Sequence, residues 1–149
     1  MKQLKSLVLL LIALFVVSGC QSNELGEKSP YAKNISHLNG LSIELDADIY
    51  APEENQVELT VINHSDEEIT YGVSYILEYL KDDTWYIVEP EEEMSFILIA
   101  HILAPGEEAS EGINLEYYEP LDEGKYRIIR LMYGGPLAAE FEEIGRAHV

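Results

Sequence analysis

The chain has 149 residues, a length that suits one compact domain once an export segment is subtracted. Its 28 acidic and 9 basic residues give a formal net charge of -19, which argues against unaided binding to nucleic acid or to an anionic membrane surface. A single cysteine excludes an internal disulfide and any metal site built from several cysteines.

The first nineteen residues have the pattern of an export signal. Two lysines are followed by an uninterrupted apolar run over residues 7–17. A helix over this run is only about 16 Å long, well short of the roughly 30 Å hydrocarbon core of a bilayer. We therefore expect residues 1–19 to form a signal-peptide helix and not a mature transmembrane segment.

Val17, Ser18, Gly19 and Cys20 resemble a bacterial lipobox, in which a thiol accepts a diacylglyceryl group and small residues before it admit the peptidase. The resemblance implies that Cys20 is the lipid attachment site and the mature N-terminus. Two or three acyl chains anchor a protein stably, whereas one does not. The expected location is the extracytoplasmic face of the cell membrane. The alternative is an ordinary cleaved signal that carries a cysteine by chance.

Residues 20–39 are predicted to be the lipidated cysteine and a flexible linker. Their composition is polar and lacks apolar periodicity. A flexible segment of this kind has a root-mean-square reach of about 20–25 Å, which would let the domain stand clear of the bilayer.

From about residue 40 to residue 142 the dominant hydrophobic period is two, which predicts β-strands. The turn-forming residues 63–66 and the polar reversal 81–84 separate neighbouring strands. The uncharged run 96–100 is predicted to be a buried strand, or otherwise an edge that accepts a partner strand. Outside that run and a late strand around Tyr126, the predicted strands cover residues 41–47, 57–61, 69–80, 85–88, 113–117 and 137–141.

Leu121, Gly124 and Tyr126 look like a tyrosine corner, in which a tyrosine near the start of a late strand bonds its hydroxyl to the backbone a few residues upstream. Gly124 allows the chain to turn with a positive φ. Lys125 and Arg127 are expected on the solvent-exposed face, opposite acidic neighbours on the next strand.

Seven short motifs follow one another along this part of the chain: Asn63-His64-Ser65-Asp66-Glu67-Glu68, Tyr71-Gly72, Leu77-Glu78, Trp85-Tyr86, Pro105-Gly106-Glu107, Gly124-Lys125-Tyr126-Arg127-Ile128 and Ala139-Glu140-Phe141. In this order, the motifs resemble those of a family of bacterial immunoglobulin-like domains found in exported proteins and lipoproteins of Gram-positive bacteria. The resemblance implies an all-β fold for residues 40–142, an immunoglobulin-like antiparallel β-sandwich of about seven to eight strands, with no catalytic residues.

Motifs for catalysis or for a cofactor are absent from the sequence. His37, His64 and His101 are isolated from one another, and no nucleophile elbow, phosphate loop or twelve-residue calcium loop occurs. Acid clusters at 46–48, 66–68 and 91–93 are expected to be solvated surface, although oxygen-rich loops of this kind could bind calcium weakly.

The leading hypothesis is therefore a non-enzymatic, lipid-anchored module with a protein-binding or structural surface. The alternative is an extracytoplasmic domain that senses a small ligand or a divalent cation. Exposed aromatic side chains suit protein contacts. The tyrosines that could lie at the surface are Tyr71, Tyr86, Tyr117, Tyr118 and Tyr133.

The last residues, 143–149, lack the acidity and the strand pattern of the preceding chain. They resemble the in-frame translation of a sequencing adapter, so we expect a read-through tail that takes no part in the fold. A natural, frayed C-terminus is the alternative.

Overall fold

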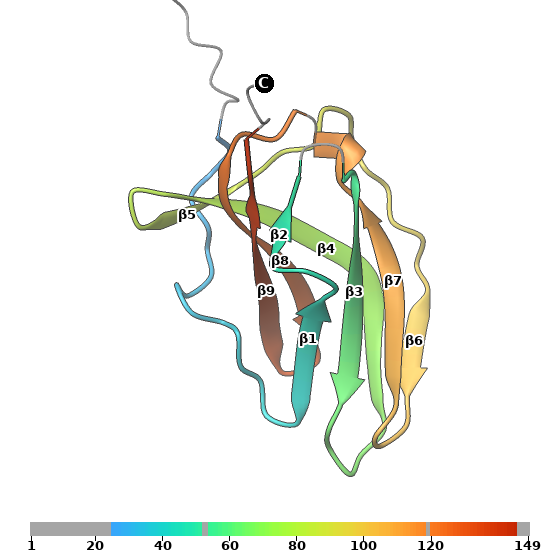
Figure 1. Ribbon diagram of the computed structural model, residues 1–149. Helices are drawn as coiled ribbons and strands as arrows, with labels where there is room; N and C mark the ends of the chain where they lie inside the picture. The colour runs from blue at the N-terminus through green and yellow to red at the C-terminus, as the bar shows by residue number, and fades with distance from the viewer. Residues whose placement is uncertain (1–24, 52–53, 119, 146–149) are drawn as a thin grey trace, which may run out of the picture.

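The computed structural model describes residues 25–51, 54–118 and 120–145, which form two packed β-sheets (Figure 1). Within these residues the elements are β1 (Leu41–Leu45), β2 (Ile49–Tyr50), β3 (Gln56–Asn63), β4 (Ile69–Lys81), β5 (Thr84–Ile87), β6 (Ala100–Leu103), β7 (Glu108–Asn114), the 3₁₀-helix η1 (Leu115–Tyr118), β8 (Gly124–Met132) and β9 (Gly135–Glu143).

One sheet contains three strands in the order β1-β3-β7, and the other contains six. The larger sheet has the order β2-β9-β8-β4-β5, and β6 pairs with the first half of β4. All strand pairs are antiparallel except the short pair β2–β9, which is parallel. The predicted all-β sandwich is confirmed, with nine strands in the described part of the chain where the sequence predicted seven to eight.

Alternation of side chains builds the core between the two sheets. Along β3, Val57, Leu59 and Val61 are buried and the residues between them are not. The facing sheet contributes Leu77, Ile128, Leu137 and others to the same apolar cluster. The strands predicted at 57–61, 69–80 and 137–141 therefore lie where their pattern indicated.

The turn after β3 is held by one buried amide side chain. Asn63 donates from Nδ2 to the carbonyl oxygens of Glu67, Leu103 and Ala104 at 2.8–3.2 Å. Its Oδ1 accepts from the backbone N–H of Ser65 at 3.0 Å. Because Asn63 is fully buried, these bonds satisfy an amide that would otherwise be costly to bury. They join the β3–β4 and β6–β7 turns, which lie at the end of the sandwich opposite η1 (Figure 1).

Two predicted strands are correct only in part. Residues 88–99 form an irregular loop, and only Ala100 of the predicted run 96–100 belongs to a strand. Residues 115–118 form η1, where the sequence predicted strand to 117. A register shift in the β4–β8 pairing between Tyr71 and Tyr75 also interrupts the regular alternation of β4. None of these three departures could be recognised from the hydrophobic periodicity of the local sequence.

In the described part of the predicted flexible linker, 20–39, the chain is bound to the domain by backbone hydrogen bonds. From Gly26 onward the chain lies against the larger sheet, where Gly26 and Ser29 donate backbone bonds to β5 and Ile35 accepts one from β9. Long-range backbone pairing of this kind leaves no periodic signal in a short polar segment.

At the C-terminal side, β9 ends at Glu143, one residue beyond the predicted domain boundary at 142. Glu143 belongs to β9, is buried, and pairs with Gly124. The backbone N–H of Ile144 donates to the carbonyl oxygen of Tyr50 at 3.0 Å. The predicted tail, 143–149, therefore begins inside a strand, and its residues 146–149 lie outside the described residues.

Candidate functional site

The predicted lipobox, Val17, Ser18 and Gly19, and the predicted lipid attachment site Cys20 lie outside the described residues. In the part of the chain that is described, no helix has the length and apolar character needed to cross a bilayer.

The predicted tyrosine corner has its residues in place. The hydroxyl of Tyr126 donates to the carbonyl oxygen of Asp122 at 2.6 Å, four residues upstream. Burial raises the pKa of this hydroxyl, so the group stays protonated and remains a donor. Gly124 has φ +150°, and Leu121 packs against the core. The corner fixes the chain at the start of β8 and therefore has a structural role.

An exposed apolar surface lies on the loop 88–99 and on β6. Leu98 is fully exposed, Ile97 is 72 % exposed and Ile102 is 60 % exposed. With Ile99 they form what we call the edge surface, because β6 is an outer strand that, in the described residues, pairs only with β4. The sequence predicted a buried strand over 96–100, or otherwise an edge strand, but residues 96–99 are an exposed loop or its flank and only Ala100 lies in the outer strand β6.

Two cavities lie beneath the same loop. One, of about 390 Å³, is lined mainly by apolar side chains that include Tyr75, Met94 and Phe96. The second, of about 500 Å³, is also lined by Tyr75, Met94 and Phe96 and adds Glu111 and Tyr117. Tyr75 and Phe96 meet edge to face with ring centroids 5.1 Å apart, so the loop is held to the sandwich by aromatic contacts while its Ile-Leu-Ile tip faces outward.

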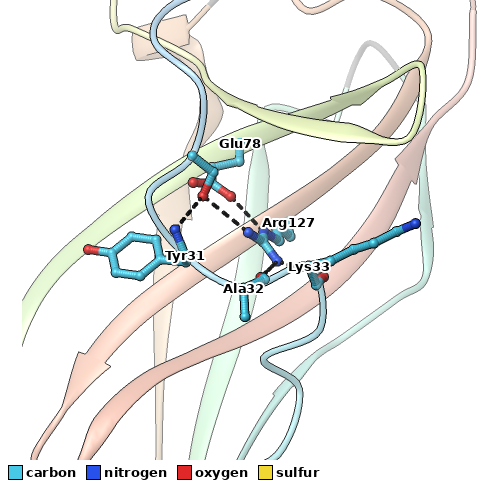
Figure 2. Close-up of polar contacts among 6 residues, drawn as sticks. Tyr31, Ala32, Lys33, Glu78 and Arg127 are labelled. Carbon is cyan, nitrogen blue, oxygen red and sulfur yellow. Dashed lines mark hydrogen bonds and ion pairs between the residues drawn. The ribbon is translucent and has the colours of Figure 1, made fainter.

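The prediction that Arg127 is exposed to solvent is wrong. The side chain does point to the outer face of the larger sheet, but it is 1 % exposed because residues 29–33 cover it (Figure 2). Its Nε donates to Oε2 of Glu78, itself fully buried, at 2.6 Å. The guanidinium also lies 4.5 Å from the ring centroid of Trp85. Lys125 does pair with an acid on the neighbouring strand, Glu140, at 3.2 Å.

Trp85 and Arg130 are two further buried side chains of the larger sheet. Trp85 lies on the covered outer face, outside the apolar cluster between the sheets. Arg130 is on the opposite, inner face, where it donates to the carbonyl oxygen of Gly72 at 2.7 Å and pairs with Glu111 of the smaller sheet. Both arginines therefore tie elements together, and each has an acidic partner.

The five tyrosines proposed for the surface differ in exposure. Tyr71 and Tyr118 are buried, and the Tyr71 ring stacks on His101. Tyr117 is half exposed, and Tyr133 in the β8–β9 turn is almost fully exposed. Tyr86 is partly buried in β5. These exposed rings lie on separate elements, so they add no continuous aromatic patch.

The acid clusters do not converge. Among the described residues, no group of three or more acidic, histidine or cysteine side chains could hold a metal ion. Asp46 accepts hydrogen bonds from the hydroxyl of Tyr50 and from the backbone N–H of Glu58. The bond from Tyr50 lowers the pKa of Asp46, against the opposing effect of burial. This carboxylate therefore organises the β1–β2 connection.

The two facing sheets and the tyrosine corner define an immunoglobulin-like sandwich. A sequence model of the bacterial Ig-like domain matches residues 37–142, and the chain belongs to that family. No curated protein matches. The matched residues begin at 37, after the segment 29–33 that covers Arg127.

Solved structures show only distant likeness. A DNA glycosylase, AlkC, from Pseudomonas fluorescens is 16 % identical with a TM-score of 0.41, covering 71 % of this chain and 31 % of its own. Sporulation control protein Spo0M from Bacillus subtilis is 18 % identical with a TM-score of 0.41, covering 72 % and 49 %. A mutant β-glucosidase from Listeria innocua is 17 % identical with a TM-score of 0.39, covering 72 % and 16 %. This chain thus spans less than half of each of these proteins.

Proposed function

We propose that the protein is an extracytoplasmic lipoprotein of the cell membrane, anchored through Cys20, whose Ig-like domain binds a partner protein at the edge surface. Family membership supports a non-enzymatic binding or structural module. The lipobox-like residues before Cys20 support the anchor.

The exposure of the edge surface carries this proposal. Ile97, Leu98 and Ile99 are consecutive and Ile102 follows three residues later, and groups of exposed apolar side chains mark interaction sites more often than single ones do. An outer strand also presents unpaired backbone groups, which natural proteins usually blunt with lysine, proline or a covering segment. Here β6 contains none of these residues, and its sequence is Ala-His-Ile-Leu. The opposite situation holds at β5, whose edge is covered by residues 26–29.

Charge indicates the chemistry of the partner. Removal of residues 1–19 takes away two lysines and no acid, so the net charge of -19 becomes -21 in the mature chain. Two such copies repel each other, which disfavours pairing of β6 with a second β6. Exposed acids flank the edge surface on both sides in the chain, at 91–93 and at 107–108. The partner that fits is an extended segment with apolar side chains and flanking lysine or arginine.

Photo-crosslinking in living cells tests this function. A benzophenone amino acid at Leu98, which makes no buried contact, should capture one discrete protein. The matched control at Tyr133, equally exposed but on the β8–β9 turn, should not. Capture at Leu98 should disappear when Ile102→Asp places a charge on the neighbouring strand. The crosslinked peptide should be apolar with basic residues nearby.

Three results would contradict the proposal. They are no captured species at Leu98, the same species at Leu98 and Tyr133, and a captured species that is a second copy of this chain.

A further inference from the structure

Residues 26–35, which we call the clasp, pair with β5 at the edge of the larger sheet and then cross its outer face. Gly26 donates its backbone N–H to the carbonyl oxygen of Ile87 at 2.9 Å, and Ile87 donates to that of Glu27 at 2.8 Å. Ser29 donates to the carbonyl oxygen of Trp85 at 2.9 Å. This pairing requires glycine at 26, because a Cβ there would lie 2.6 Å from the carbonyl oxygen of Ile87.

Beyond β5 the clasp crosses the outer face of the sheet over Arg127 (Figure 2). The guanidinium donates from Nη1 to the carbonyl oxygens of Ala32 and Lys33, both at 3.1 Å. At its far end Ile35 accepts a bond of 3.0 Å from the backbone N–H of Ala138 in β9. The clasp therefore spans the sheet from the β5 edge to β9.

The contacts that hold the clasp are polar, and its own side chains are not buried. Every residue from 26 to 35 is exposed or only partly buried. Segments that bury little apolar surface open at lower free energy than the core of the same protein. The sandwich, by contrast, has a large apolar cluster of its own between the sheets. The clasp is therefore the element expected to open first, while the two sheets stay folded.

We infer that the clasp is a releasable element that sets the distance between the membrane anchor and the domain. This inference rests on the proposed anchoring at Cys20. Gly26 is the sixth residue after Cys20, so with the clasp docked the connection spans at most about 20–22 Å at full extension. Release to residue 37, the seventeenth residue after Cys20, raises that limit to about 56–61 Å. Opening also uncovers Trp85 and the Glu78–Arg127 pair, which are buried in the docked state.

A matched pair of glycine variants tests the release. Gly26→Ala introduces the clash with Ile87, whereas Gly72→Ala in β4 places a Cβ where nothing lies within 4 Å. In the purified mature protein, trypsin should cut after Lys28 and Lys33 on the order of tenfold faster in Gly26→Ala, because proteolysis follows the population of the open form. The single tryptophan, Trp85, should become accessible to acrylamide in the same variant.

Far-ultraviolet circular dichroism should be the same for wild type, Gly26→Ala and Gly72→Ala, because the sandwich stays folded. The inference is overturned if Gly26→Ala is cut no faster than Gly72→Ala, or if faster cutting comes only with loss of the β signal. It is also overturned if wild type is already cut at Lys28 and Lys33 as fast as a free peptide of the same sequence.

A second measurement tests the reach. On vesicles that contain dansyl-labelled lipid, energy transfer from Trp85 to the surface should fall in Gly26→Ala relative to Gly72→Ala. Equal transfer in the two variants would overturn the link between release and reach. Failure of the anchor itself gives a different result, because wild type would then not bind the vesicles at all while the trypsin difference would remain.

Discussion

The buried pair Glu78–Arg127 gives the sharpest quantitative prediction. Glu78 is fully buried and Arg127 is 1 % exposed, with 2.6 Å between Oε2 and Nε. The other carboxylate oxygen, Oε1, has no hydrogen-bond partner within the described residues. Arg127→Met would therefore leave a buried carboxylate without its countercharge. Breaking a buried pair from one side costs about 3–5 kcal/mol of stability.

Replacing both residues should cost less than replacing one. Glu78→Leu combined with Arg127→Met removes both charges, and apolar side chains then fill the space between β4 and the clasp. Such replacements are often close to neutral. The bonds from Arg127 to Ala32 and Lys33 are lost as well, so we expect a net loss below about 3 kcal/mol.

Urea unfolding followed by far-ultraviolet circular dichroism measures these free energies, with the slope compared between variants to verify two-state behaviour. Circular dichroism is preferred because Trp85 lies against the mutated site. The reasoning is refuted if Arg127→Met costs less than about 1 kcal/mol, or if the double variant is less stable than Arg127→Met alone.

Four further predictions concern other parts of the molecule. Tyr126→Phe should lower the free energy of unfolding by about 1–3 kcal/mol, because a buried carbonyl loses its donor; an unchanged urea midpoint would contradict the corner. Gly124→Ala should destabilise the protein more than an alanine at an ordinary strand position, because φ is +150° and the added Cβ would lie 2.5 Å from a ring carbon of Tyr79. A thermal melt checks this, and a melting temperature equal to that of wild type would contradict it. Asp46 has a lowered pKa in the folded state, so its contribution is present above its ordinary value of 3.8 and is lost as pH falls further; Asp46→Asn should flatten the acid limb of a stability-pH curve, and an unaltered limb would count against the Tyr50 bond. Millimolar calcium should leave the melting temperature unchanged, since no acid cluster of the described residues converges on one point, and a calcium-dependent rise would support the sensor alternative.

Much of the sandwich follows from alternation. Val57, Leu59 and Val61 signal their buried face without any long-range information, and the polar reversal at 81–84 becomes the β4–β5 turn, where Asp82 and Asp83 take positive φ. The tyrosine corner could also be predicted, because it depends on residues only four apart. Local patterns thus predict the strands whose neighbours are regular.

The errors have a common physical origin in long-range coverage. Alternation places Arg127 on the outer face correctly, but it does not reveal that a polar segment some 95 residues earlier covers that face. The same limit applies to residues 96–99, whose composition indicates burial. There β5 and β6 pair with the two ends of β4, and the loop that connects them leaves Ile97 and Leu98 in solvent. The edge surface could be predicted from sequence only as an alternative.

The most direct test of the account is the covalent state of Cys20. Mass spectrometry of the protein extracted from membranes should find a mature chain that begins at Cys20 and carries a diacylglyceryl thioether, and Cys20→Ala should release the folded domain from the membrane. An unmodified Cys20 in a membrane-retained protein, or a mature chain that begins at another residue, would contradict it.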